Sequence, residues 1–150
     1  MLHGMFEHIC VIGYGVVTGA VLKTVHMLSD KWGYSFEYIE HEVHPFNLAD
    51  KYAKSNEIES HCIEDRNELL RYFLNRANKR TLIISASNNF LFPDTLTDNP
   101  NITIINFHNA LLPELPGRNA PSWAIYLGKN KTGITWHYVT KGVDEGDIII

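Results

Sequence analysis

The chain has 150 residues, of which 45% are hydrophobic and 20% are charged, and its formal net charge is −4. This size and composition indicate one globular domain over residues 1–150, and the lack of excess positive charge argues against nucleic acid as a partner. Two cysteines are too few for a disulfide framework, and without a signal peptide or roughly 20 consecutive apolar residues we expect a cytoplasmic protein with no membrane partner.

Strands and helices are predicted to alternate in the first half of the chain. A β-branched run at residues 8–12 ends at Gly13-Tyr14-Gly15, and apolar residues then recur at helical spacing over residues 16–28. The buried face of that helix is predicted to carry Val17, Val21, Val25 and Leu28. We expect a second strand at residues 35–39 and a short helix at residues 47–54.

The second half continues this alternation. Asp65, with Glu68 three residues later, predicts the start of a helix that runs to about residue 77. Continuous apolar runs predict buried parallel strands, and shorter patterns predict helices and closing strands around a glycine turn. The strands are expected at residues 81–85, 102–107, 132–139 and 147–150, and the helices at residues 93–97 and 121–127.

This order of elements predicts an α/β domain with a mostly parallel sheet. The sequence stops within the apolar run Ile148-Ile149-Ile150. Because a natural domain rarely stops inside a buried strand, we expect the domain to be truncated at its C-terminal end.

The first glycine turn allows several interpretations. Residues 13–19 approach the dinucleotide-binding pattern, and Glu37 and Glu40 lie near the distance of its acidic residue, but the third glycine comes one position late. An NAD site is therefore disfavoured. The turn either presents backbone N–H groups at a helix N-terminus to an anionic or polar substrate group, or is simply a tight connection.

The cysteines and histidines do not predict a metal site. Cys10 lies in an apolar run and is expected to be a small buried hydrophobe. His41 and His44 lack the zinc-protease spacing, and Pro45 prevents the helix that would place both on one face. His61, beside Cys62, lacks a second pair of ligands, so we place these histidines on the surface or in loops.

Polar residues gather at the end of the predicted strand over residues 102–107. Asn106 and His108 are two positions apart, so their side chains point to the same side, at the strand end where open α/β sheets bind ligands. An ordered series of short motifs follows. It comprises Asn106-x-His108, Leu112-Pro113, Gly117, Thr132-Gly133-x-Thr135 and Asp144-x-Gly146.

This series resembles the formyltransferase family that uses 10-formyltetrahydrofolate. The resemblance covers the whole chain in architecture, but specific motifs are found only from Ser85 onward. It implies a Rossmann-like fold, with a twisted, mostly parallel sheet covered by helices on both faces. It also implies an enzyme that takes a formyl group from 10-formyltetrahydrofolate without a metal, through catalytic Asn106, His108 and Asp144.

By the same resemblance, Asn106 and His108 would donate hydrogen bonds to the oxyanion formed when an amine attacks the formyl carbon. Asp144 would favour protonated His108 and assist proton transfer. The pterin ring would lie between the backbone of residues 90–92 and the loop at residues 141–144. The implied substrate- and cofactor-binding residues are Phe90, Leu91, Phe92, Gly117, Thr135, His137, Lys141, Gly142 and Val143.

Simpler interpretations of some of these positions stay open. Residues 90–92 could be core residues, Asn88 and Asn89 could cap their loop, and His137 could be purely structural.

Departures from the family pattern bear on the acceptor. The first glycine turn lacks the polar side chains with which the glycinamide ribonucleotide enzymes hold a phosphate, and the Arg-rich element of the tRNA enzymes is reduced to Arg118. The stretches at residues 122–124 and 135–137 are similar to formylation domains of nonribosomal peptide synthetases and to small-molecule amine formyltransferases. We therefore expect a small-molecule or carrier-bound amine acceptor. A formyltetrahydrofolate hydrolase and a non-catalytic folate-binding module are the alternatives.

Overall fold

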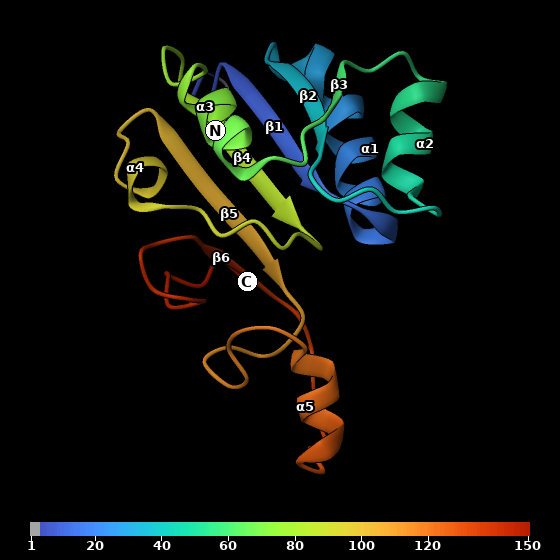
Figure 1. The fold of residues 1–150 in the computed structure, drawn as a ribbon, viewed down its shortest axis with the longest axis vertical. Helices are drawn as coiled ribbons and strands as arrows, with labels where there is room; N and C mark the ends of the chain where they lie inside the picture. The colour runs from blue at the N-terminus through green and yellow to red at the C-terminus, as the bar shows by residue number, and fades with distance from the viewer. Residues whose placement is uncertain (1–3) are drawn as a thin grey trace.

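Residues 4–150 are described in the computed structural model, and within them a single six-stranded sheet organises the chain (Figure 1). The strand order is β3-β2-β1-β4-β5-β6, and every neighbouring pair is parallel except β5 and β6. The elements are β1 (His8–Gly13), α1 (Gly15–Trp32), β2 (Ser35–Glu40), α2 (Leu48–Ser55), β3 (Ser60–Cys62), α3 (Arg66–Leu74), β4 (Thr81–Ala86), α4 (Asp94–Thr97), β5 (Ile102–His108), α5 (Ala120–Tyr126) and β6 (Thr135–Tyr138).

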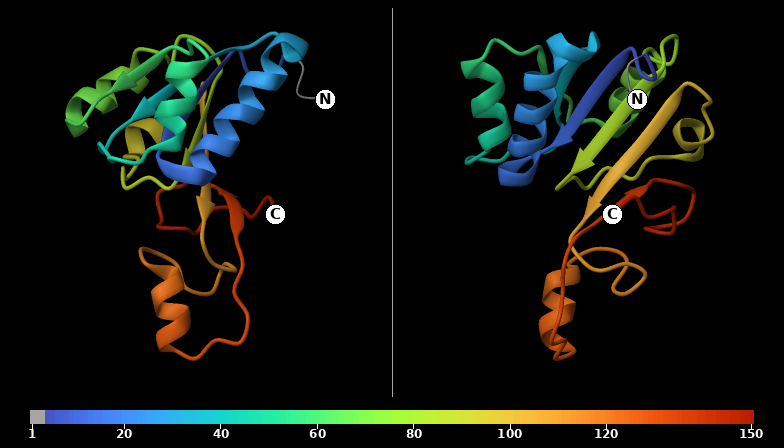
Figure 2. Two further views of the ribbon diagram at one scale, coloured as in Figure 1. Left: turned by 90° about the vertical axis from the view of Figure 1, so that its right-hand side faces the viewer. Right: turned by 180° about the vertical axis from the view of Figure 1, so that it is seen from behind.

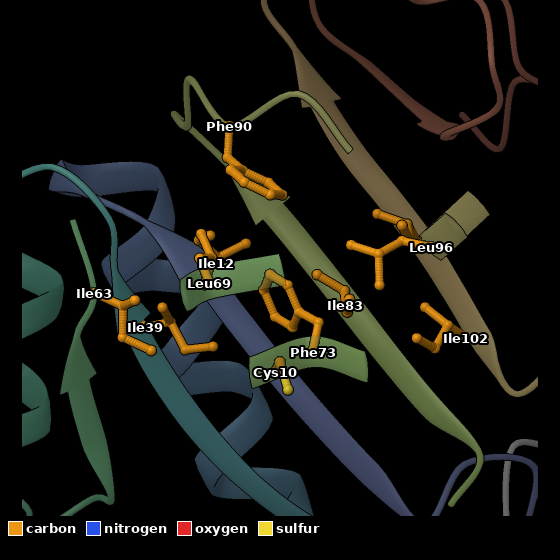
Figure 3. Close-up of a cluster of buried hydrophobic side chains, with 11 residues drawn as sticks. Cys10, Ile12, Ile39, Ile63, Leu69, Phe73, Ile83, Phe90, Leu96 and Ile102 are labelled. Atoms are coloured by element: carbon orange, nitrogen blue, oxygen red, sulfur yellow. The ribbon is translucent and has the colours of Figure 1, made fainter. Parts of the chain in front are cut away.

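Helices cover both faces of the sheet (Figure 2). Alternate residues of β1 face opposite sides, so Ile9 and Val11 pack beneath α1 and α2 while Cys10 and Ile12 pack beneath α3 and α4. Figure 3 shows the second of these clusters, in which Phe73 of α3 lies over the central strands. Burial on both faces explains why the central strands read as continuous apolar runs. The expected fold class is confirmed.

A close approach between two strand ends fixes the first turn. Gly13 has φ of 139°, and a Cβ added there would lie 1.7 Å from the backbone oxygen of Ala86. Thr18 of α1 donates a hydrogen bond to that same oxygen at 2.6 Å. Only glycine fits this position. The contact lies where β1 and β4 end side by side, at the carboxyl end of the sheet.

Two details of the predicted helices are wrong. The buried residues of α1 are Thr18, Leu22, Val25 and Ser29, whereas Leu28 is 39% exposed. The hydroxyls of Thr18 and Ser29 are bonded to backbone carbonyls, which permits the burial of polar residues that a hydrophobic pattern cannot anticipate. Helix α3 begins after its predicted Asp65 N-cap but ends at Leu74 rather than near residue 77.

The edges of the sheet also differ from expectation. The three-residue strand β3 is absent from the sequence prediction, and the strand expected at residues 132–139 is reduced to β6. Residues 147–150 follow β6 through backbone hydrogen bonds but form only an isolated bridge, between His137 and Ile148, instead of a strand. Among residues 4–150, no helix has the length and apolar character needed to cross a bilayer.

Candidate functional site

The predicted polar residues lie on neighbouring strands at the carboxyl end of β5. In the antiparallel register of β5 and β6, Asn106 is opposite His137 and His108 is opposite Thr135. Alternation along each strand turns all four side chains to the face covered by α3 and α4. Thr135 and His137, two of the implied binding residues, therefore share a face of the sheet with Asn106 and His108.

Asp144 joins the cluster from the loop after β6. Its carboxylate lies 3.4 Å from Nδ1 of His108 and 3.3 Å from Nε2 of His137. The backbone N–H of Gly117 donates to the same carboxylate at 2.6 Å. Asn106 meets the group through His137, since its Nδ2 lies 3.3 Å from Nε2 of that ring. The three residues predicted as catalytic are therefore brought together, with His137 between two of them.

Both ring nitrogens of His108 face oxygen atoms. Nε2 lies 2.8 Å from the carbonyl of Leu115, which can only accept a hydrogen bond, and Nδ1 faces Asp144. The imidazolium is the form that donates from both nitrogens. A direct bond from Nε2 to a substrate oxygen requires the Leu115 carbonyl to give up this position.

Thr135 has a different environment from the one its predicted ligand role requires. Its hydroxyl donates to the carbonyl of Ala110 at 2.7 Å and accepts from the N–H of Leu112 at 3.1 Å. The side chain thus fastens the loop after β5, which contains the cis peptide between Leu112 and Pro113. In this structure Thr135 shapes the site through the backbone.

The two segments predicted to enclose the pterin both border α4. Residues 90–92 lead directly into this helix, and Lys141 pairs with its Asp94 at 3.8 Å and with the adjacent Asp98 at 2.8 Å. Within residues 4–150, the backbone N–H and C=O groups of Leu91, Phe92, Gly142 and Val143 have no hydrogen-bond partner. These groups can serve a flat heterocycle that carries donors and acceptors on its edge.

The side chains of these segments divide between core and solvent. Phe90 is buried in the core against His41 and Phe73, whereas Leu91 and Val143 are exposed. Asn88 accepts a hydrogen bond from the N–H of Phe90 at 3.2 Å. Asn88 therefore caps this loop, and the core interpretation holds for Phe90.

One backbone donor of the first glycine turn is already used. The N–H of Gly15 donates to Oδ1 of Asn47 at 3.1 Å, and Nδ2 of Asn47 donates to Glu40 at 2.6 Å. Glu37 is fully buried against Arg76. Neither acidic residue that could have held a ribose is accessible, which weighs further against a dinucleotide site.

Glu37 is the centre of a second polar cluster, between β2 and α3. Burial raises the pKa of this carboxyl, but hydrogen bonds from His8, Arg76, Cys10 and Tyr72 outweigh burial and hold the pKa below its ordinary value. Burial, followed by the nearby Glu37 charge, raises the pKa of Cys10 well above its usual range. Cys10 is thus the inert buried residue that its apolar surroundings indicate.

Among residues 4–150, two groups of metal-ligand type share Glu37. His8, Cys10 and Glu37 have ligand atoms within 4.8 Å of one another, as do Glu37, Glu59 and His61. However, the guanidinium of Arg76 bonds both carboxylate oxygens of Glu37, at 2.5 and 2.9 Å, so a cation already occupies the shared ligand. The geometry favours an ion pair at this position.

His41 and His44 lie in loops, as expected. His41 is nevertheless buried, and its Nδ1 bonds the carbonyl of Ile63 at 2.7 Å. His44 stacks on Tyr14 with ring centroids 3.5 Å apart. His61 lies in strand β3 instead of a loop, with its side chain 35% exposed.

Sequence reasoning missed two contributors to the site. The Leu115 carbonyl cannot be found from residue types, because any residue has one. Ser85, which bonds Asn106, could have been found by aligning the predicted strands, since both residues lie near the ends of adjacent apolar runs.

Comparisons with known proteins identify the relatives of this chain. The family model described as formyl transferase matches residues 20–150. Methionyl-tRNA formyltransferase from Bacillus pumilus (strain SAFR-032) is 42% identical over 73 residues, which cover 49% of this chain and 23% of that protein. The protein of the same name from Syntrophus aciditrophicus (strain SB) is 36% identical over 69 residues, covering 46% of this chain and 22% of that protein. The matched stretch thus spans less than a quarter of these relatives' length.

Solved structures share the fold. Phosphoribosylglycinamide formyltransferase from Bacillus halodurans superposes with a TM-score of 0.73 at 24% identity, covering 96% of this chain and 77% of that one. The protein of the same name from Anaplasma phagocytophilum gives a TM-score of 0.71 at 25% identity, covering 95% and 68%.

Proposed function

This chain belongs to the formyl transferase family, and we propose that it transfers a formyl group from 10-formyltetrahydrofolate to the primary amine of a small-molecule or carrier-bound acceptor. The observation that carries the proposal is the cluster of Asn106, His108, His137 and Asp144 at the carboxyl end of β5. The proposal assigns this chemistry to residues 1–150 as one catalytic domain.

The reaction requires fixed donors near the formyl oxygen. The acceptor nitrogen forms a bond to the formyl carbon, negative charge develops on the formyl oxygen, and the bond from that carbon to the folate nitrogen then breaks. The Nδ2 group of Asn106 is one donor to that oxygen, and Nε2 of His108 becomes the second once the Leu115 carbonyl has moved away from it. Loss of one such donor typically costs about 10²–10³ in rate.

A proton must also move from the acceptor amine to the folate nitrogen. Asp144 is suited to this task because its carboxylate contacts both imidazoles and its side chain is 12% exposed. The N–H of Gly117 fixes one of its oxygens, so the carboxylate is oriented before substrate arrives. In this arrangement Asp144 aligns His108 and accepts the amine proton directly or through water.

The formyl donor fits the groups that border the cluster. The unpaired backbone groups of Leu91, Phe92, Gly142 and Val143 offer hydrogen bonds to the edge of a pterin ring. Leu91 and Phe92 lead into α4, which lies on the same face of the sheet as Asn106, and Lys141, which precedes Gly142, pairs with Asp94 and Asp98 of this region. The pterin would therefore lie next to the catalytic side chains.

The acceptor class follows from chemistry that the named relatives share. Methionyl-tRNA and phosphoribosylglycinamide both carry an aminoacyl group, whose nucleophile is a primary amine. For this chain, the net charge of −4 favours a small or carrier-bound aminoacyl compound or amino sugar over tRNA.

The test is a panel of acceptors. The protein is mixed with 10-formyltetrahydrofolate and with amino sugars, amino acids or carrier-bound aminoacyl groups, and tetrahydrofolate release and formylated product are measured. We expect stoichiometric release and product with at least one amine. Formate release without any amine would identify a hydrolase instead, and binding of the donor without release under any condition would identify a folate-binding module.

A further inference from the structure

Three polar side chains form a row across the sheet at the catalytic cluster. The strand registers place Ser85 of β4 and His137 of β6 opposite Asn106 of β5. Ser85 is 1% exposed, and its Oγ lies 2.8 Å from Oδ1 of Asn106. The chemistry proposed above does not use Ser85, although its hydroxyl touches a catalytic side chain.

The direction of the hydrogen bonds in this row is fixed at one end by a backbone group. The N–H of Phe90 can only donate, and it lies 3.2 Å from Oδ1 of Asn88. This contact orients the amide of Asn88, so that its Nδ2 donates to Oγ of Ser85 at 3.3 Å. The single hydroxyl hydrogen of Ser85 then points to Asn106, and the atom of Asn106 that receives it must be the oxygen.

The other end of the row is compatible with the same orientation. Nδ1 of His137 lies 2.9 Å from the carbonyl of Tyr138, which can only accept, so this nitrogen carries a hydrogen. Nε2 lies 3.3 Å from both Nδ2 of Asn106 and Oδ1 of Asp144, so it accepts from Asn106 when the ring is neutral and donates to Asp144 when the ring is protonated. The Ser85 end of the row therefore decides the orientation and turns the NH₂ group of Asn106 toward the catalytic cluster.

This orientation decides whether Asn106 can act. The oxygen and nitrogen of an amide are nearly equal in size, so shape alone does not prevent the side chain from rotating by half a turn. A rotated Asn106 would present an acceptor to the developing oxyanion and repel it. Rotation would also leave the hydroxyl hydrogen of Ser85 without an acceptor in a buried place, which is costly.

We propose that Ser85 is a positioning residue of the formyl-transfer site, whose hydroxyl, oriented by Asn88, keeps the NH₂ group of Asn106 turned toward the reacting oxygen. The inference rests on the proposed function, because it assigns Ser85 a part in the same site. Ser85 itself touches no reacting atom.

A double-mutant cycle tests this role. Ser85→Ala should lower kcat about 10-fold, the effect of losing one buried hydrogen bond, and change KM for the formyl donor less than about twofold. In the Asn106→Ala background, Ser85→Ala should have almost no further effect. Ser85→Thr retains the hydroxyl and should recover most of the activity.

The matched control is Ser29→Ala. Ser29 is also buried, but it lies on α1 and its hydroxyl bonds the carbonyl of His26 in the same helix. Its replacement should leave kcat within about twofold of the wild type. If Ser85→Ala lowers kcat by the same factor with and without Asn106, Ser85 does not act through that residue, and the inference is overturned.

A measurement independent of activity separates this inference from the proposed function. In the amide spectrum of ¹⁵N-labelled protein, the NH₂ pair of Asn106 is the pair that disappears in Asn106→Ala. We expect slow hydrogen exchange of this pair in the wild type and faster exchange in folded Ser85→Ala. Unchanged exchange would overturn the inference even in an active enzyme, whereas absent formyl transfer would overturn only the function.

Discussion

Gly146 holds the loop of Asp144 against the end of β6. A Cβ added at this position would lie 1.8 Å from the backbone oxygen of Tyr138, which cannot move without disturbing the strand. Asp144 is two residues earlier and has φ of 54°, so the loop is tightly constrained on both sides of the carboxylate. The distances from Asp144 to the two imidazoles therefore depend on this glycine.

We predict that Gly146→Ala lowers kcat about 10²-fold, because displacement of a catalytic group by about 1 Å has an effect of this size. The loop, and not the strand, is expected to shift, and because the loop lies outside both core clusters the melting temperature should change little. Gly19→Ala is the control, because a Cβ there would meet its nearest atom at an ordinary 3.5 Å. Equal activity of the two variants would contradict the role given to the loop.

The sequence predicts which residues form the candidate site better than it predicts the hydrogen bonds that these residues make. The spacing of Asn106 and His108, together with the later Asp144, was enough to expect one site, because a strand end and a family motif carry that information. The bond between His108 and the Leu115 carbonyl was not predictable, since it depends on how the loop after β5 folds back. The hydrogen bond from the Thr135 hydroxyl to the Ala110 carbonyl, which holds the loop after β5, was missed for the same reason.

Between elements, the pair of Glu37 and Arg76 joins β2 to the turn that follows α3. Glu37 is fully buried and Arg76 bonds both of its oxygens, while the guanidinium also stacks over the ring of Tyr72 at 3.6 Å. Breaking a buried pair by removing one partner typically costs about 3–5 kcal/mol. This pair thus holds the C-terminal end of α3, which comes just before Arg76, against the face of the sheet that carries the candidate site.

We expect Arg76→Ala to lower the free energy of unfolding by about 3 kcal/mol at neutral pH. Because the pKa of Glu37 is lower in the folded chain than in the unfolded one, the stability from its ionised form is present above pH of about 4 and is lost in acid. The difference between wild type and variant should therefore shrink as the pH falls below about 4.

Urea unfolding at several pH values measures this difference. Arg71→Ala, which replaces an exposed residue of α3 itself, is the control and should change stability by less than about 0.5 kcal/mol at every pH. A loss in Arg76→Ala that stays constant from pH 7 to acid would show that the ion pair is not its cause.

The long, periodic elements were predicted well, and the short or polar ones were not. The helix that begins after Asp65 starts where this predicted cap indicates, because a side-chain oxygen that accepts a backbone N–H group is a local signal. Strand β3 has three residues, and its pairing with β2 is a tertiary contact without a local signature. Arg76 and Glu37 are 39 residues apart, so their pairing could not be inferred from spacing.

In the whole molecule, α5 stands apart from the sheet (Figures 1 and 2). None of its residues belongs to either core cluster of the described chain, and Trp123, Ile125 and Tyr126 are each more than half exposed. Its local stability should therefore be low compared with that of the central strands.

Hydrogen exchange tests this difference. We predict that the backbone amides of α5 exchange at least about 10²-fold faster than those of β1 and β4, which are buried on both faces. Equal protection in the two regions would show that α5 opens only together with the core.

The layered architecture was predictable because each central strand is apolar on both sides and is followed by a helical pattern. The position of α5 was not, because its apolar residues give the same pattern whether or not another element covers them. The family was evident from motifs spread over only part of the chain, and the acceptor is not encoded in those motifs.

The role of Asn106 and His108 is measured by comparing tetrahydrofolate release from 10-formyltetrahydrofolate, with a productive amine, by wild type, Asn106→Ala and His108→Ala. Each variant should bind the formyl donor nearly as well as the wild type but transfer the formyl group about 10²–10³-fold more slowly. Wild-type rates in both variants, in folded protein, would show that formyl transfer does not depend on this cluster.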